Sequence, residues 1–302
     1  MSLLEFVRRY STTEACIRHI ESVRWRAGAY CPRCHHRHIY HYADGRRHRC
    51  ADCKLQFRIT TGTMFSESPL KLLPKWFAAI YLVTEHRKGV SSVQLVRDIG
   101  VTQKTAWHMM HRIHNAAGVA FQDGKLQGAV EIDEAYFGGE TSRKAKGKCI
   151  DRRGYGEDDS ILLGMKERGG KVRTYQIGQP TTKVVTPIIH SALQPGTRIY
   201  TDNSSLYLRA GQDFKRESVI HMKGEYARGE VHTQGIEGFW ATLRRAYHGV
   251  HHWWSRKHSQ RYADAAAFRA NVRLLDGASR VSVLITAGGV PGNHLPYKRL
   301  VA

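Results

Sequence analysis

Three acidic residues, Asp133, Asp202 and Glu237, offer the clearest chemistry in this sequence of 302 residues. Apolar and polar side chains alternate up to Asp133, which predicts a half-buried strand with this carboxylate near its end. A later strand, predicted over 197–201, ends in Asp202. Apolar residues recur at helical spacing around Glu237, so its carboxylate is expected at the edge of the buried face of a helix.

Three carboxylates that converge on one point need a cation between them, because like charges oppose ionisation. Hard divalent ions meet this need, and Mg2+ or Mn2+ suits an open carboxylate site. A pair of such ions, roughly 3.5–4 Å apart, is suited to phosphoryl transfer. We therefore expect Asp133, Asp202 and Glu237 to hold two magnesium or manganese ions. The alternative is three surface acids that never meet.

Four cysteines form a second candidate metal site, of a structural kind. Cys31 and Cys34 make one CxxC pair, and after fifteen further residues Cys50 and Cys53 make another. This spacing is typical of zinc held by four thiolates in a tetrahedron. The residues between the pairs predict a hairpin, so we expect a zinc ribbon that binds Zn2+. The neighbouring histidines are expected to be surface groups or phosphate contacts rather than ligands: His35, His36, His38, His41 and His48.

The charge of the chain indicates a polyanionic partner. Lys and Arg total 47 against 26 Asp and Glu, which gives a net charge of +21 and a pI of about 10.0. The basic residues are spread along the whole chain, as expected of a protein that covers DNA. A merely basic, solvated surface is the alternative. No apolar run is long enough for a membrane span and no signal peptide is evident, so we expect a cytosolic protein with reduced cysteines.

Two helical stretches follow the ribbon and are separated by a tight turn. They cover 91–98 and 102–115, with Gly100 in the turn and Thr102 as an N-cap. A helix, a glycine-containing turn and a helix predict a helix-turn-helix, whose second helix would face a DNA major groove. An ordinary helical hairpin is the alternative. The residues expected to face the groove are Gln103, Lys104, Trp107, His108, His111 and Arg112.

The order of predicted elements gives a multidomain chain of mixed α and β structure. We expect a helical lead-in (1–30), the zinc ribbon (31–66), the helix-turn-helix (70–117), a linker (118–128), a catalytic domain (129–280) and a tail (281–302). The catalytic domain should contain three strands, a helix, an acid-bearing strand and then helices. That order is typical of the ribonuclease-H-like fold with a mixed sheet, in which the strands of Asp133 and Asp202 are neighbours. Residues 141–159 are expected to form an exposed loop, in which Cys149 has no assigned role.

The chain resembles the DDE-type transposases of bacterial insertion sequences, in particular the group with an N-terminal zinc ribbon. The resemblance covers nearly the whole chain. Its most specific parts are the two CxxC pairs, the stretch from Glu131 to Gly139, and the stretch from Ile236 to Trp240. It extends to Arg24-Trp25, Gly28, Gln56-Phe57, Thr61-Gly62-Thr63 and Thr201-Asp202.

The resemblance implies roles for single residues. Asp133, Asp202 and Glu237 would be the catalytic acids. Arg244, seven residues after Glu237, stands where such families often carry Lys, and Arg keeps the charge with a different phosphate geometry. Gln234 occupies a position where Asn is expected.

The resemblance also implies an activity and partners. The protein would bind the terminal inverted repeats of its element, cleave DNA strands with metal ions, and transfer a 3′-hydroxyl end to target double-stranded DNA. Two ends to be cut imply a homodimer or higher oligomer, in the cytoplasm and associated with the nucleoid. Two alternatives remain open: a zinc-ribbon DNA-binding regulator without catalysis, and a structure-specific nuclease or resolvase.

Overall fold

The computed structural model describes residues 1–138, 160–219 and 227–302, so the loop expected over 141–159, with Cys149, lies outside the described residues. The chain divides into two compact units. Unit 1 comprises Met1–Gln122 together with Val272–Ala302, and unit 2 comprises Asp123–Asn271. Within the described ranges, no helix is long and apolar enough to cross a membrane.

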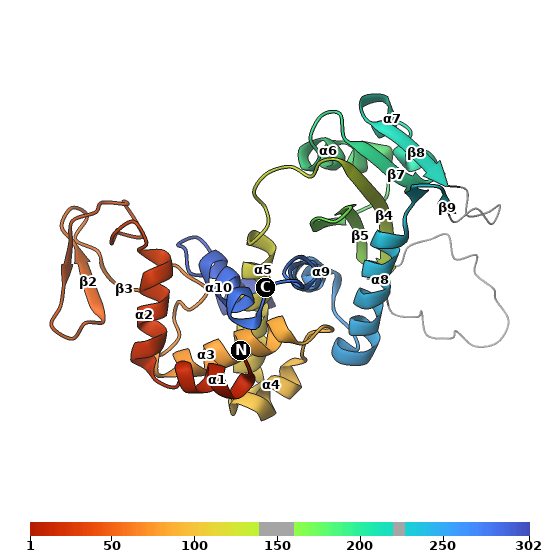
Figure 1. The fold of residues 1–302 in the computed structure, drawn as a ribbon. Helices are drawn as coiled ribbons and strands as arrows, with labels where there is room; N and C mark the ends of the chain where they lie inside the picture. Colours follow the sequence, from red (N-terminus) through yellow and green to blue (C-terminus); the bar gives the residue numbers. More distant parts are fainter. Residues whose placement is uncertain (139–159, 220–226) are drawn as a thin grey trace. The chain divides into compact units, whose positions relative to one another are not determined.

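Unit 1 begins with two short helices and a small antiparallel sheet (Figure 1). The helices are α1 (Leu3–Arg9) and α2 (Thr13–Arg24), and the sheet has the order β1 (Ile39–His41), β2 (Arg47–Cys50), β3 (Gln56–Arg58). Ile39 and Phe57 pack with Cys31 and Cys50 in a core of their own. The hairpin predicted between the two CxxC pairs is therefore present, with a third strand added to it.

A bundle of helices forms the rest of unit 1. It contains the short η1 (Leu70–Leu72), α3 (Leu73–Glu85), α4 (Ser92–Ile99), α5 (Gln103–Val119), α10 (Gly277–Gly288) and α11 (Tyr297–Val301). Helix α3 packs against α1, α2, α4, α5 and α10. Its sequence is apolar on nearly every side, and Trp76, Phe77 and Ile80 are all buried, as expected of a helix surrounded by others.

Local capping explains where α4 and α5 begin and end. The Ser91 hydroxyl accepts a hydrogen bond from Gln94 N, and the Thr102 hydroxyl accepts one from Thr105 N. Gly100 lies in the left-handed region with φ of 60°, so glycine ends α4 without strain. The two helices predicted over 91–98 and 102–115 are thus present.

The C-terminal residues differ from the sequence prediction of a catalytic domain that runs to residue 280 and a separate tail over 281–302. The structure places Val272–Ala302 in unit 1. Asp276 caps α10 by accepting hydrogen bonds from Ala278 N and Ser279 N. Val281, Leu284 and Ile285 are buried, and α10 packs against α5, α3 and α2. This apolar stripe finds its partners in the N-terminal helices, which explains why the segment belongs to unit 1.

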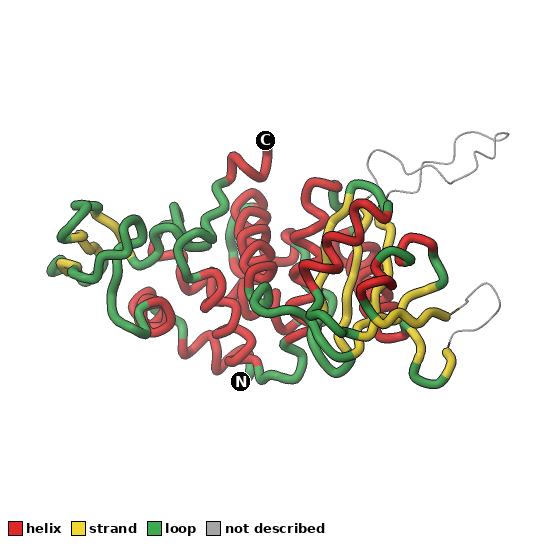
Figure 2. Tube along the Cα trace, turned by 90° about the horizontal axis from the view of Figure 1, so that it is seen from above, coloured by secondary structure: helices red, strands yellow, loops and turns green. Residues whose placement is uncertain are grey.

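Unit 2 is built on a mixed five-stranded sheet of order β6-β5-β4-β7-β8 (Figure 1). β4 runs antiparallel to β5 and parallel to β7, and β8 is parallel to β7. The strands are β4 (Ala129–Phe137), β5 (Ser160–Glu167), β6 (Val172–Ile177), β7 (Arg198–Asp202) and β8 (Lys215–Val219). Figure 2 shows these strands lying between helices.

Helices cover both faces of this sheet. On one face, Val185 and Ile189 of α6 (Thr182–Ala192) share a core with Val130 and Ile132 of β4. On the opposite face, α8 (Gln234–Ala246) packs against β4 and β5. The remaining elements are η2 (Ser205–Tyr207), α7 (Ala210–Asp213), the hairpin of β9 (Ala227–Arg228) and β10 (Val231–His232), the π-helical turn η4 (Tyr247–His251), and α9 (Arg256–Asn271).

Candidate catalytic and zinc sites

Strand β4 places Asp133 on the sheet face that α8 covers. Side chains alternate along a strand, so Glu131 and Asp133 point away from the face where Val130 and Ile132 join the α6 core. The predicted position near the strand end is wrong, because β4 continues through buried Ala135 to Phe137 and pairs with β5 over that length. Asp133 nevertheless lies beyond the end of the parallel ladder with β7, whose last pair is Glu131 with Tyr200.

The register of that ladder brings the second acid beside the first. Because Glu131 pairs with Tyr200, the same register two residues further along both strands sets Asp133 next to Asp202. The turn after β7 is fixed by Asp202 itself, whose Oδ1 accepts a hydrogen bond from Ser204 N at 3.1 Å. Arg216 supports the same turn by donating to Asp202 O at 2.9 Å and to Ser204 O at 3.2 Å.

Helix α8 carries the third acid, Glu237, in its first turn. The helix lies against β5 where that strand has Gly164, the residue paired with Asp133. A Cβ atom at Gly164 would stand 2.4 Å from Trp240 Cζ2, so the glycine is needed for this close approach. Glu237 is exposed at the edge of the buried stripe, and Thr233 Oγ1 donates to its Oε1 at 2.6 Å.

Electrostatics show that the acids are neighbours. Burial raises the pKa of Asp133 to about 7, and the charges of Glu134, Asp202 and Glu237 add to the rise. Their oxygen atoms are not closely clustered, however. In the described part of the chain, only the four cysteines bring three or more ligand atoms within 4.8 Å of one another. The acids thus share one face without forming a closed cage.

Glu134 is a further buried acid of β4, for which the sequence predicted no role. It lies next to Asp133 on β4 and therefore points to the opposite face, where its Oε2 accepts a hydrogen bond from Tyr207 Oη. Burial raises the pKa of the Glu134 carboxyl group, and Tyr207 opposes that rise. The strand alternation alone could have placed Glu134 on the α6 side.

Arg244 lies in the last turn of α8, where its side chain is exposed. It is seven residues from Glu237, about two helical turns, so the two residues occupy the same side of the helix. Gln234, at the start of α8, is exposed as well. These positions keep both side chains accessible to a large substrate.

The groove-facing set expected on α5 is wrong for two of its six members. Gln103 and Lys104 are exposed and Trp107 and His108 are half-buried, but His111 and Arg112 are fully buried. The cause is the C-terminal segment, which covers this side of α5 and could not be placed from the sequence. His108 Nε2 lies 3.2 Å from Leu295 O, and the Lys104 ammonium lies over the Tyr297 ring at 4.5 Å.

Arg112 has a structural role in place of the expected DNA contact. Its Nε donates to Leu295 O at 2.8 Å and its Nη1 to Met64 O at 3.1 Å, with a further bond to Ser66 O. A buried guanidinium is tolerated only when such acceptors surround it. Arg112 therefore joins α5 to the C-terminal segment and to the loop before α3.

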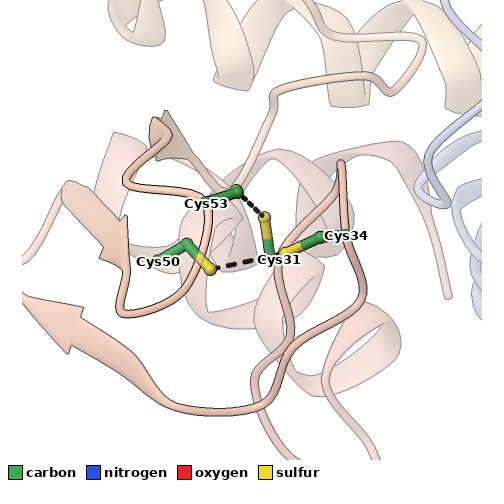
Figure 3. A group of neighbouring side chains, drawn as sticks. All are labelled: Cys31, Cys34, Cys50 and Cys53. Atoms are coloured by element: carbon green, nitrogen blue, oxygen red, sulfur yellow. Dashed lines mark hydrogen bonds between the residues drawn. The ribbon is translucent and has the colours of Figure 1, made fainter.

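The four-cysteine cluster expected from the CxxC spacing is confirmed (Figure 3). Cys31 Sγ lies 3.5 Å from Cys53 Sγ, and Cys34 Sγ lies 3.5 Å from Cys50 Sγ. Four thiolates at about 2.3 Å from a tetrahedral zinc would be roughly 3.8 Å apart, so the cluster fits this ion. His35 and Lys54, which directly follow the two CxxC pairs, share a left-handed backbone conformation with φ of 59° and 58°. The chain therefore makes the same kind of turn after each pair. The cluster contains no histidine ligand.

Comparison with known proteins agrees with this division of the chain. Residues 125–271 match the family described as the ISXO2-like transposase domain, and residues 11–56 match the transposase zinc-ribbon domain. An uncharacterized protein in transposable element ISH50 of Halobacterium salinarum is 30% identical over 280 residues, which span 88% of this chain and 93% of that protein. No solved structure matches the chain. The first match coincides closely with unit 2, and the second includes the four cysteines, which supports a structural zinc.

Proposed function

Because the chain belongs to the insertion-sequence transposases that combine a zinc ribbon with an ISXO2-like transposase domain, we propose that it cuts and joins DNA with the acids of unit 2. Asp133, Asp202 and Glu237 are the catalytic acids in this proposal. The observation that carries it is the placement of all three on the α8 face of one sheet. The parallel register sets Asp133 beside Asp202, and α8 brings Glu237 to the same face.

The strand order supports a ribonuclease-H-like assignment for unit 2. Three antiparallel strands, β4 to β6, precede a helix and two strands that join the sheet parallel to β4. The sequence predicted β4 to β6, α6 and β7 in this order, but it did not predict β8, since only helices were expected after Asp202. We also assign α4 and α5 to a helix-turn-helix, because the two predicted helices and the turn between them are present. Of the residues expected to face the groove, Gln103 and Lys104 are the most exposed and are the ones that we retain.

The donor set suits two Mg2+ or Mn2+ ions. Carboxylate oxygens are the ligands that such hard ions prefer. Burial raises the pKa of Asp133 and the charges of neighbouring acids add to the rise, and a cation would offset both effects. When bound, the ions would activate the attacking oxygen and stabilise the leaving one. Glu237, exposed at the helix edge, would supply a further carboxylate to an ion that Asp133 and Asp202 hold.

The proposed reaction consists of two displacements at phosphorus. Water first attacks the phosphodiester at the end of the element, which breaks the P–O3′ bond and leaves a free 3′-hydroxyl. That hydroxyl then attacks a target phosphodiester, so a new P–O bond forms as the target strand breaks. Neither step needs a covalent enzyme intermediate. The acids position the reacting groups, and Arg244 is suited to contact a phosphate near them.

DNA binding is assigned to the basic surface as a whole and to the zinc ribbon and α4–α5 in particular. With a net charge of +21, most of the affinity would come from phosphate contacts and would fall steeply with salt. Two element ends must be held together, so the active complex is expected to be a dimer or a higher oligomer.

The test is strand cleavage and joining on the element's own ends with Mg2+ or Mn2+. We expect the wild type to cleave and join, and Asp202→Ala to lose both by at least about 1,000-fold, since a misplaced or missing metal removes most of the rate enhancement. The matched control is Asp213→Ala, an exposed acid of the same unit paired with His190, which should retain activity.

Two outcomes would favour the alternatives. Cleavage without joining would indicate a structure-specific nuclease or resolvase. Specific end binding with no cleavage by either protein would indicate a DNA-binding regulator in which the three acids have no catalytic part.

A further inference from the structure

Glu131 is a buried carboxylate whose two oxygens are both engaged. It lies two residues before Asp133 on the same face of β4 and is 2% exposed. Its Oε1 accepts a hydrogen bond from Arg168 Nε at 3.2 Å, and its Oε2 accepts one from Ile236 N at 2.8 Å. A carboxylate removed from water to this degree is stable only with such partners.

Arg168 is itself held from several directions. Its backbone N donates to Ala129 O at 2.9 Å, and its Nη2 donates to His232 O at 3.1 Å. Its guanidinium lies over the Tyr200 ring, 4.3 Å from the centroid. Arg168 therefore links the β5–β6 turn to β4, to β7 and to β10, and presents Nε to Glu131 from a fixed position.

The bond to Ile236 N replaces an ordinary helix cap. The first amides of a helix lack partners within it, and the N-cap side chain commonly accepts from one of them. At the start of α8 the N-cap residue Thr233 makes no such bond, and its hydroxyl donates to Glu237 instead. Glu131, a side chain of the sheet, satisfies the amide and places a negative charge at the positive end of the helix.

Gly235 permits this docking. A Cβ atom there would stand 2.7 Å from Glu131 Oε2 and 3.0 Å from Lys166 Cε. The first turn of α8 is thus seated on Glu131, and the middle of the helix is seated on Gly164 through Trp240. These two contacts fix how deeply α8 lies on the sheet and how it is rotated about its axis.

We infer that Glu131, with Arg168, is a positioning residue for Glu237, the residue that follows Ile236. It sets the first turn of α8 so that Glu237 faces Asp133 and Asp202. Because Arg168 and the Ile236 amide occupy its oxygens, Glu131 is not itself a metal ligand. This inference rests on the proposed function for its catalytic consequence, but its structural part can be measured without activity.

The structural part is tested by hydrogen exchange on the full-length, zinc-loaded protein. In the wild type, the amides of the first turn of α8 should be protected through the Glu131 bond. In Glu131→Ala they should exchange at least about tenfold faster, while amides of β4 and β5 keep their protection. Glu131→Gln should restore most of the protection, since its amide oxygen can still accept from Ile236 N.

The catalytic part is tested by the cleavage rate as a function of Mn2+ concentration. Glu131→Ala should cleave about 100-fold more slowly at saturating Mn2+, because a shift of about 1 Å in a catalytic group costs that much. Binding of element ends, assigned to unit 1, should be unchanged. Glu131→Gln should recover part of the rate, and Glu217→Gln, an exposed acid on β8, is the matched control with wild-type behaviour.

The outcomes separate this inference from the proposed function. A wild type that cleaves, beside a folded Glu131→Ala that cleaves equally well or exchanges equally slowly in α8, would overturn the inference alone. A wild type without metal-dependent cleavage would overturn the proposed function, and the exchange measurement would then decide whether Glu131 fixes α8. If Glu131→Ala does not fold, Glu131→Gln and Arg168→Lys carry the test, and both should show intermediate exchange and intermediate rates.

Discussion

Two acids on one strand face have opposite electrostatic environments. Glu131 is surrounded by donors, from Arg168 and from the first turn of α8. Asp133, two residues later, is surrounded by other acids, and burial raises its pKa to about 7. Glu131, whose charge is balanced by hydrogen-bond donors, is suited to a structural role. Asp133, which has other acids beside it, is suited to bind a cation. The alternation of side chains does not separate them, since both acids lie in one stretch, and it was the family resemblance that singled out Asp133 as catalytic.

The burial of the Asp264 carboxyl group in α9 should make the stability of the protein depend on pH. Burial raises the pKa of Asp264 from 3.8 to about 7, although Gln260 donates to its Oδ1 at 2.7 Å and Arg261 opposes the rise. The unfolded chain ionises this group near its ordinary pKa. Between about pH 4 and pH 7 the unfolded chain therefore releases a proton that the folded protein keeps, and the free energy of unfolding falls as pH rises.

Removing this charge should remove that pH dependence. Asp264→Asn is expected to raise the free energy of unfolding at pH 8 by about 1–2 kcal/mol, a discounted figure because the side chain is partly exposed. At pH 4 the variant and the wild type should be nearly equal. Urea unfolding at both pH values measures the difference, and equal stability at pH 8 would show that Asp264 is solvated.

At the scale of elements, the position of Glu237 depends on how closely α8 packs on β5. This close packing is possible because β5 has a glycine, Gly164, at the contact. Gly164→Ala would place a Cβ 2.4 Å from Trp240 Cζ2 and 2.9 Å from Ile236 Cδ1. We expect a loss of about 1–3 kcal/mol in the free energy of unfolding, together with slower cleavage, because α8 must move away from the sheet.

Gly238→Ala is the matched control on the same helix. No atom lies within 4 Å of a Cβ built there, so alanine should be neutral or stabilise the protein by up to about 1 kcal/mol. Denaturant unfolding measures both variants. Equal effects of the two substitutions would show that α8 is not seated through Gly164.

Elements with a local signal could be predicted, and those that depend on distant partners could not. The two CxxC pairs predict the zinc cluster from spacing alone, and capping residues predict α4 and α5. The exposure of His111 and Arg112 was predicted wrongly, since both are buried. Arg112 is covered by residues near Leu295, far along the chain. A polar side chain on a helix gives no sign of being buried under a later segment.

At the scale of the whole molecule, the chain closes unit 1 with residues from both of its ends. Val272–Ala302 follow unit 2 in the sequence but pack with the N-terminal helices. The sequence prediction of a tail over 281–302 missed α10, which Asp276 caps and whose apolar stripe ends in Ile285. Nothing in that pattern says which unit the helix joins, since an apolar stripe can be buried against any complementary face.

The placement of the three proposed catalytic acids also arises at this scale. Asp133, Asp202 and Glu237 could be selected from the order of elements, but the parallel register and the glycine contacts that bring them to one face are properties of the assembled sheet. In the proposed function, three segments distant in sequence therefore meet at one metal site.

Iron-directed cleavage of the protein backbone would show whether these segments meet at one ion. Fe2+ bound in place of Mg2+, with ascorbate and hydrogen peroxide, produces radicals that cut the chain beside the ion. We expect fragments that end near Asp133, near Asp202 and near Glu237, all suppressed by excess Mg2+ and by Asp202→Ala. Cuts at one of these segments only, or none that Mg2+ suppresses, would contradict it.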